Sequence, residues 1–170
     1  GRHAWLFQSA RTPAKAMVVF FHGNAENLTS HFASLSWLPR EGYDYVIFDY
    51  RGYGLSEGKP SPESTVEDGV TVLQWAVDQK KPIILFGQSL GGAVLLRSLQ
   101  EVDGSLTPEQ RASIKLVALD STFGSYLRAG SSTLKSSWIT WPFQWLSYLL
   151  LSDRMAPRID AWPKSYRWLV

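Results

Sequence analysis

Residues 84–92 read ILFGQSLGG, an apolar run followed by a serine between two glycines. Residues 83–86 are short and apolar, which is typical of a strand buried on both faces. Glycines at positions 87 and 91 indicate a turn so tight that a Cβ would clash there. Because residues 90–101 favour a helix, Ser89 is predicted at the apex of a strand-to-helix turn, exposed as a nucleophile would be. A glycine-rich turn with an incidental serine is the alternative.

The composition indicates one globular domain. The chain has 170 residues, 45% hydrophobic and 19% charged, which is enough apolar material for a core and argues against disorder. A net charge of +2 without a block of basic residues argues against a nucleic-acid partner. With no cysteine, disulfides and cysteine-based zinc sites are excluded. No metal or cofactor is expected.

Apolar runs alternate with helical patterns along the chain. Residues 61–78 show the clearest helix, with an N-cap serine, a proline in the first turn and apolar positions spaced by four, three and four. Shorter helices are expected at residues 27–38 and 107–110. We therefore predict an α/β fold, with a mostly parallel central sheet and helices on both faces. Its strands are expected at residues 3–7, 16–21, 45–48, 83–86, 114–119 and 165–170.

A glycine-rich loop after the third strand imitates a phosphate-binding motif. Residues 52–60 read GYGLSEGKP, but position 57 is Glu where a dinucleotide fingerprint needs glycine. A P-loop would need glycine at Tyr53 and a hydroxyl residue at Pro60. Both motifs fail, so we interpret this segment as a tight loop.

The segment FFHGNAE at residues 20–26 is the candidate partner of the serine turn. Acyl transfer needs two backbone amides that stabilise a developing oxyanion. One would be the amide of Leu90, directly after the serine at the positive end of a helix. The other would be that of Asn24, with Ala25 as the fallback, because a His-Gly turn aims the next amide inward. His22 itself is interpreted as a structural turn residue.

Four motifs in this order, FFHGNAEN, FDYRGYGLSEG, LFGQSLGG and LDSTF, resemble the α/β-hydrolase superfamily. The pattern is most similar to its serine aminopeptidase and monoacylglycerol lipase-like branch. The resemblance implies a serine hydrolase, an esterase, lipase or thioesterase by mechanism, that cleaves an ester, thioester or amide of a small-molecule acyl substrate without a cofactor. It assigns the nucleophile elbow to Ser89 and the oxyanion hole to the amides of Asn24 and Leu90. It gives Asp49 and Arg51 no catalytic role.

The histidines do not follow the family order, which is serine, then acid, then histidine. His3, His22 and His31 all precede Ser89. We expect the chain to be a fragment, with the acid and histidine loops beyond its last residue. A non-catalytic binding or scaffold domain is the alternative. Asp120 either supports the structure or supplies the acid. If the 170 residues alone were active, His22 would be the first candidate base.

Residues 123–160 lie where such folds insert a lid. Within them, residues 136–152 carry no charge and are rich in tryptophan and leucine. A proline, a glutamine and several serines make this stretch a poor membrane span. A cover over the acyl pocket, an interfacial membrane or lipid contact, and a plain core helix remain open as its role. No signal peptide is visible, and an N-terminal targeting or anchor segment could be missing, so compartment and oligomeric state stay unassigned.

Overall fold

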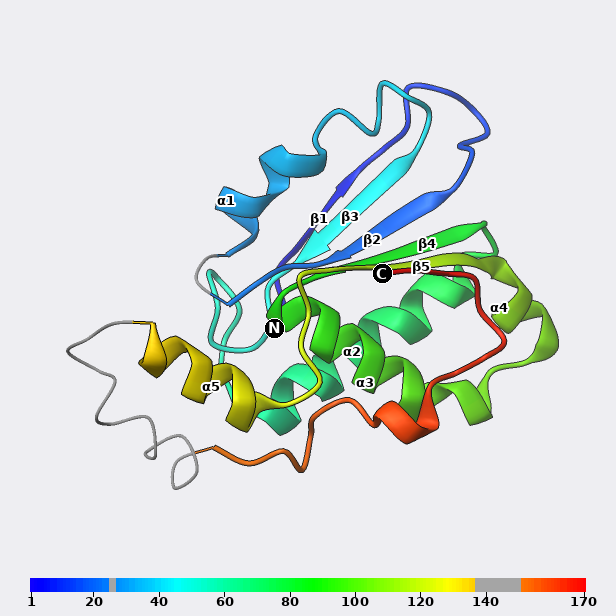
Figure 1. The fold of residues 1–170 in the computed structure, drawn as a ribbon. Coiled ribbons are helices and arrows are strands. Elements are labelled where there is room, and N and C mark those ends of the chain that lie inside the picture. The colour runs from blue at the N-terminus through cyan, green and yellow to red at the C-terminus, as the bar shows by residue number, and fades with distance from the viewer. Residues whose placement is uncertain (25–26, 137–150) are drawn as a thin grey trace.

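The computed structural model describes residues 1–24, 27–136 and 151–170. A six-stranded sheet in the order β1-β3-β2-β4-β5-β6 forms its centre (Figure 1). Only β1 runs antiparallel, to β3, and the other described neighbours pair in parallel. The predicted mostly parallel sheet is therefore confirmed. Its strands are β1 (Ala4–Phe7), β2 (Met17–Phe21), β3 (Asp44–Phe48), β4 (Ile83–Gln88), β5 (Ile114–Asp120) and β6 (Trp168–Leu169).

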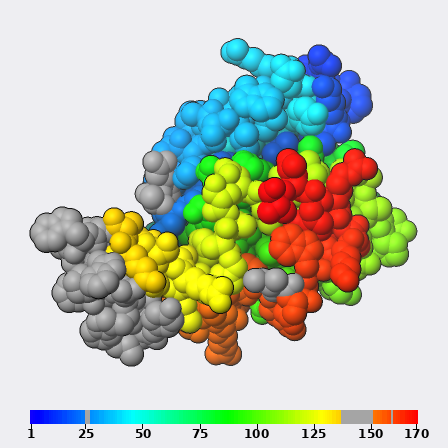
Figure 2. All heavy atoms as spheres, viewed as in Figure 1, coloured from blue at the N-terminus to red at the C-terminus, as the bar shows by residue number. Residues whose placement is uncertain are grey.

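Helices cover both faces of the sheet. The α-helices are α1 (Leu28–His31), α2 (Pro62–Asp78), α3 (Leu90–Val102), α4 (Pro108–Ser113) and α5 (Tyr126–Lys135). Short 3₁₀ turns are η1 (Phe32–Leu35), η2 (Asp103–Ser105) and η4 (Ile159–Ala161). Helices α2 and α3 lie on one face, and α1 lies on the other (Figure 1). In Figure 2 the blue to cyan segments form the upper part of the molecule, the yellow and orange segments lie in the lower part, and the red C-terminal end lies at mid-height on the right.

Alternate residues of the central strands build two separate cores. Val19 and Phe21 of β2 face α2 and α3, where they pack with side chains such as Leu73 and Leu95. Their neighbours Val18 and Phe20 point to the other face and pack with Leu28 of α1. Burial on both faces explains why β2 reads as an uninterrupted apolar run.

Hydroxyl caps begin two of the predicted helices. Ser61 accepts the amide of Ser64, and the Ser64 hydroxyl accepts the amide of Ser61, which fixes the start of α2. Thr107 and Gln110 make the same reciprocal pair at α4. Both starts agree with the sequence.

The segment expected as one helix at residues 27–38 is broken. A four-residue α1 passes into the 3₁₀ turn η1, and irregular turns follow. The hydroxyls of Ser34 and Ser36 donate to the carbonyls three residues before them. These local bonds compete with the α-helical pattern. The last strand is also shorter than expected, since β6 pairs with β5 over two residues.

The expected lid region is described only in part. Helix α5 lies within it, but residues 137–150 are outside the described residues, so Trp141 and Trp145 are not placed. The predicted cover over the serine therefore stays a prediction. None of the helices described here has the length and apolar character needed to cross a membrane.

Candidate functional site

Ser89 lies between the end of β4 and the first residue of α3, with φ +52° and ψ −117°. This is a costly backbone conformation for an L-residue other than glycine. Its amide donates to the carbonyl of Asp120 over 2.8 Å, and its own carbonyl accepts the hydroxyl of Thr122 over 2.9 Å. The structure thus contains the strained turn that the sequence predicts, while the role of Ser89 as nucleophile stays a prediction.

The glycines around Ser89 allow the first turn of α3 to lie directly against the sheet. A Cβ on Gly91 would overlap the carbonyl oxygen of Phe21 at the end of β2. A Cβ on Gly87 would lie 2.6 Å from the Cα of Gly92. Both glycines of the G-x-S-x-G motif are therefore required sterically.

The loop after β2 lies beside the serine. A Cβ built on Gly23 would be 3.7 Å from the Cβ of Ser89. The side-chain oxygen of Asn24, the next residue, accepts a hydrogen bond from the hydroxyl of Tyr53. The amide of Leu90 begins α3, where the first amides of a helix have no intrahelical partner. The structure brings the two loops together, and the oxyanion role of their amides remains a prediction, as does the fallback Ala25, which is outside the described residues.

The buried carboxylate of Asp49 contacts residues at both ends of this loop. It accepts the amide of Leu28 over 2.7 Å, and its Oδ1 lies 3.5 Å from Nε2 of His22. The Nδ1 of His22 is 2.7 Å from the carbonyl oxygen of Gly23. Burial lowers the pKa of His22 and keeps the ring neutral. Both ring nitrogens thus face groups of the scaffold, which matches the predicted structural role of His22.

His31 is the histidine that sequence reasoning missed at this site. Its Cε1 lies 3.9 Å from the position of a Cβ on Gly23, the point that is also 3.7 Å from the Cβ of Ser89. Its ring stacks on His22 with 5.4 Å between the ring centres. The first fallback base named from the sequence is His22, and a role as base for either ring stays a prediction. Nothing in the sequence indicated that His31, the last residue of α1, would lie close to Gly23.

Asp120 supports the turn through its backbone and its side chain. Its carboxylate accepts hydrogen bonds from Ser121 over 2.8 Å and from Gln88 over 3.0 Å, and these two bonds lower its pKa. Its carbonyl holds the amide of Ser89. These contacts agree with the structural role, and a role as the catalytic acid is untested.

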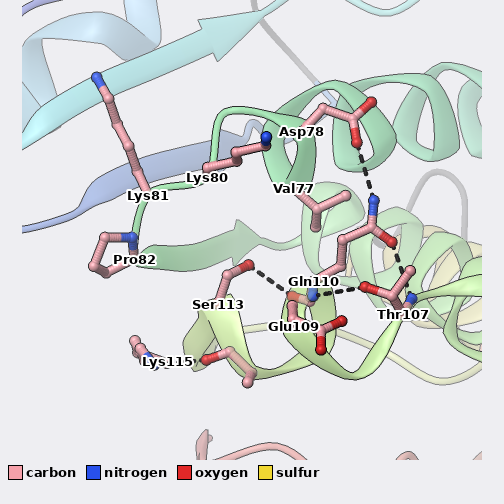
Figure 3. Close-up of a pocket in the computed structure, with 11 residues that line it drawn as sticks. Val77, Asp78, Lys80, Lys81, Pro82, Thr107, Glu109, Gln110, Ser113 and Lys115 are labelled. Carbon is pink, nitrogen blue, oxygen red and sulfur yellow. Dashed lines mark hydrogen bonds between the residues drawn. The ribbon is translucent and has the colours of Figure 1, made fainter.

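The large pocket drawn in Figure 3 lies away from the serine. It has a volume of about 640 Å³ and is lined near the starts of β4 and β5 by Pro82, Ser113 and Lys115, among others. Ser89 follows the opposite end of β4. Because ligands of parallel α/β sheets bind at the carboxyl ends of the strands, this pocket is not the candidate site. Within the described ranges no group of three histidine or carboxylate side chains could hold a metal.

Comparison with known proteins shows the family. The family model described as serine aminopeptidase, S33 matches residues 12–117, more than half of the chain. The chain belongs to this family. The resemblance to α/β-hydrolases that the motifs indicated is therefore confirmed.

Relatives and solved structures agree with this assignment. YfhR of Escherichia coli K12 is 35% identical over 140 residues, covering 78% of this chain and 47% of that protein. The lysophosphatidylserine lipase ABHD12 of Danio rerio is 33% identical over 114 residues, covering 63% of the chain and 29% of the relative. The monoacylglycerol lipase of Paleococcus ferrophilus shares the fold with a TM-score of 0.57 at 22% identity, over 79% of this chain and 51% of that one.

The Pyrococcus furiosus esterase Pf2001 has the same TM-score, 0.57, at 20% identity, and the match covers 88% of this chain and 59% of that one. The chain spans about half the length of the curated relatives it matches first. This S33-family chain thus has the sheet of an α/β-hydrolase, and lipases and esterases are among the proteins that it is similar to.

Proposed function

We propose that this chain carries the nucleophile and the oxyanion hole of a serine hydrolase that cleaves an ester, thioester or amide. One observation carries the proposal: Ser89 is held at φ +52° between β4 and α3, beside the Gly23 turn. Strained serines of this kind project their hydroxyl from the carboxyl edge of an α/β sheet. The family membership and the lipase and esterase relatives support the same chemistry.

In the proposed mechanism the Oγ of Ser89 attacks the substrate carbonyl carbon while a general base takes the hydroxyl proton. The carbonyl oxygen becomes an oxyanion and accepts hydrogen bonds from the amides of Asn24 and Leu90. The intermediate collapses to an acyl-enzyme as the leaving group departs with a proton, and water then releases the acid. We place the acid and the histidine base beyond Val170, in the family order.

A fluorophosphonate probe and p-nitrophenyl esters test this proposal on the full-length gene product. We expect probe labelling and ester turnover that both disappear in Ser89→Ala. The 170-residue chain alone should turn over poorly, because loss of the base costs about 10⁶ in kcat in a serine protease. The remnant should not exceed about 10³–10⁴ over water.

The alternative is a binding or scaffold domain that kept the fold without the base. It is favoured by one observation, since His3, His22 and His31 all precede Ser89. A folded full-length protein that neither reacts with the probe nor turns over any ester would support this alternative. Fast, Ser89-dependent turnover by the 170 residues alone would instead require a base within them, with His22 and His31 the residues to substitute.

A further inference from the structure

A small pocket borders the serine turn. It has a volume of about 200 Å³ and lies where the loop after β3, the start of α2, the start of α3 and the start of α5 meet. We propose that this pocket is the acyl subsite of the enzyme and that it selects substrates with a short acyl chain. The inference rests on the proposed function and adds its substrate class. The lining residues are Tyr53, Pro60, Ser61, Pro62, Thr65, Leu90 and Tyr126.

Two lining residues connect the pocket to the proposed chemistry. Leu90 follows Ser89 directly and is the proposed oxyanion donor on α3. Tyr53 donates its hydroxyl to the side chain of Asn24, the other proposed donor. Leu90 and Tyr53 thus connect the pocket to both residues of the proposed oxyanion hole.

The chemistry of the lining suits a hydrocarbon chain. Two prolines, the rings of Tyr53 and Tyr126 and the side chain of Leu90 make up most of the described lining. Burial raises the pKa of Tyr126 to about 12, so its phenol stays neutral beside an apolar chain. The acyl chain of an ester needs no polar partner, and we assign it to this pocket.

The volume sets the chain length. A water molecule occupies about 30 Å³ in the liquid, and a methylene group is of similar size. A pocket of about 200 Å³ therefore holds roughly six carbon atoms. Pockets for drug-sized ligands are larger, about 300–1,000 Å³. The pocket accommodates a butanoyl to hexanoyl chain, and the remainder of a longer acyl group would extend beyond it and stay unburied.

Tyr126 forms the wall that can be altered most cleanly. It lies at the first position of α5, and its ring packs edge-to-face on Phe123 with 5.4 Å between the ring centres. Among the described residues its hydroxyl has no hydrogen-bond partner. Tyr126→Phe therefore keeps the wall without breaking a described hydrogen bond. Tyr126→Leu and Tyr126→Ala open the wall by increasing amounts.

The test measures kcat/KM of the full-length gene product for p-nitrophenyl esters from acetyl to dodecanoyl. We expect kcat/KM to rise by about fourfold for each added methylene that is buried, with a break near six carbons. Tyr126→Phe should keep the break at the same length, whereas Tyr126→Leu and Tyr126→Ala should move it to longer chains. A second series with a constant acetyl group and alcohols of increasing length should show no such displacement.

The outcomes separate this inference from the function it rests on. Ser89-dependent turnover without a break, or a break that no Tyr126 variant moves, overturns the acyl subsite and leaves the serine hydrolase intact. A displacement in the alcohol series instead of the acyl series also overturns it. Complete absence of Ser89-dependent turnover overturns the proposed function and the subsite together. Urea unfolding of each variant identifies any that has lost its fold, and the remaining variants then decide.

Discussion

Replacement of Ser89 by glycine is expected to stabilise the chain while it removes the proposed nucleophile. Ser89 has φ +52° and ψ −117°, a region that glycine adopts without a steric penalty. Ser89→Ala is the matched control, because alanine loses the hydroxyl but keeps the Cβ and therefore the strain. The difference between the two variants in the free energy of unfolding therefore measures the effect of a Cβ on the backbone at position 89.

The structure supplies the magnitude. A strained residue of this kind costs about 1–3 kcal/mol. Glycine relieves this strain, but it also gives the unfolded chain more conformational freedom, which lowers the free energy of unfolding by about 0.4–1 kcal/mol. The hydrogen bonds of Ser89 to Asp120, Gly92 and Thr122 all use its backbone atoms, so both variants keep them. The two terms together leave a gain of about 0–2.6 kcal/mol, so Ser89→Gly should unfold with a free energy about 1 kcal/mol higher than Ser89→Ala.

Urea denaturation followed by tryptophan fluorescence measures this difference, and thermal unfolding gives a second reading. For a chain of this size, 1 kcal/mol moves the midpoint by about 2–4 °C. Both variants should fail to react with the fluorophosphonate probe. If Ser89→Gly is no more stable than Ser89→Ala, the turn is not strained and the structural argument for an activated serine is refuted.

Two further predictions concern the scaffold of the same site. Gly91→Ala should destabilise the chain by about 3 kcal/mol or more in urea, because its Cβ would overlap the carbonyl of Phe21. Gly104→Ala, whose Cβ meets nothing within 4 Å, should change stability by no more than about 1 kcal/mol, and equal effects would contradict the packing argument. Because burial lowers the pKa of His22, the unfolded chain binds its proton first as the pH falls. Stability should decline below about pH 6.5 with a slope of up to ~1.4 kcal/mol per pH unit, and an unchanged slope in His22→Gln would refute this assignment.

The sequence predicted those parts of the fold that depend on local residue types, such as apolar runs, glycines and helix caps. The short apolar runs at β2 and β4 indicated strands; β2 is buried on both faces, whereas in β4 buried and half-buried residues alternate. The glycines at 87 and 91 indicated the tight turn that the structure contains. The caps at Ser61 and Thr107 were equally local signals, readable from spacing alone. Local chemistry was sufficient for these elements.

The rest depended on contacts between distant segments. The helix breaks between α1 and η1, where the hydroxyls of Ser34 and Ser36 donate to backbone carbonyls. Helix propensities alone do not predict such local hydrogen bonds. The position of His31 beside Gly23 follows from that break and from the packing of Phe20, so no spacing rule could reveal it. The pocket beside Leu90 is formed by four separate segments and has no sequence motif.

Asp49 shows how the scaffold maintains the geometry that the proposed chemistry needs. A buried carboxylate is costly without partners, and this one is satisfied by the amide of Leu28 and faces His22. The same carboxylate occupies the space that a Cβ at Gly54 would fill, which explains the glycine there. The Asp49 carboxylate thus connects the loop after β2 with the turn after β3. Ser89 itself is held by other segments, since its amide donates to Asp120 and its carbonyl accepts from Thr122, both at or after the end of β5, and these bonds fix its strained conformation.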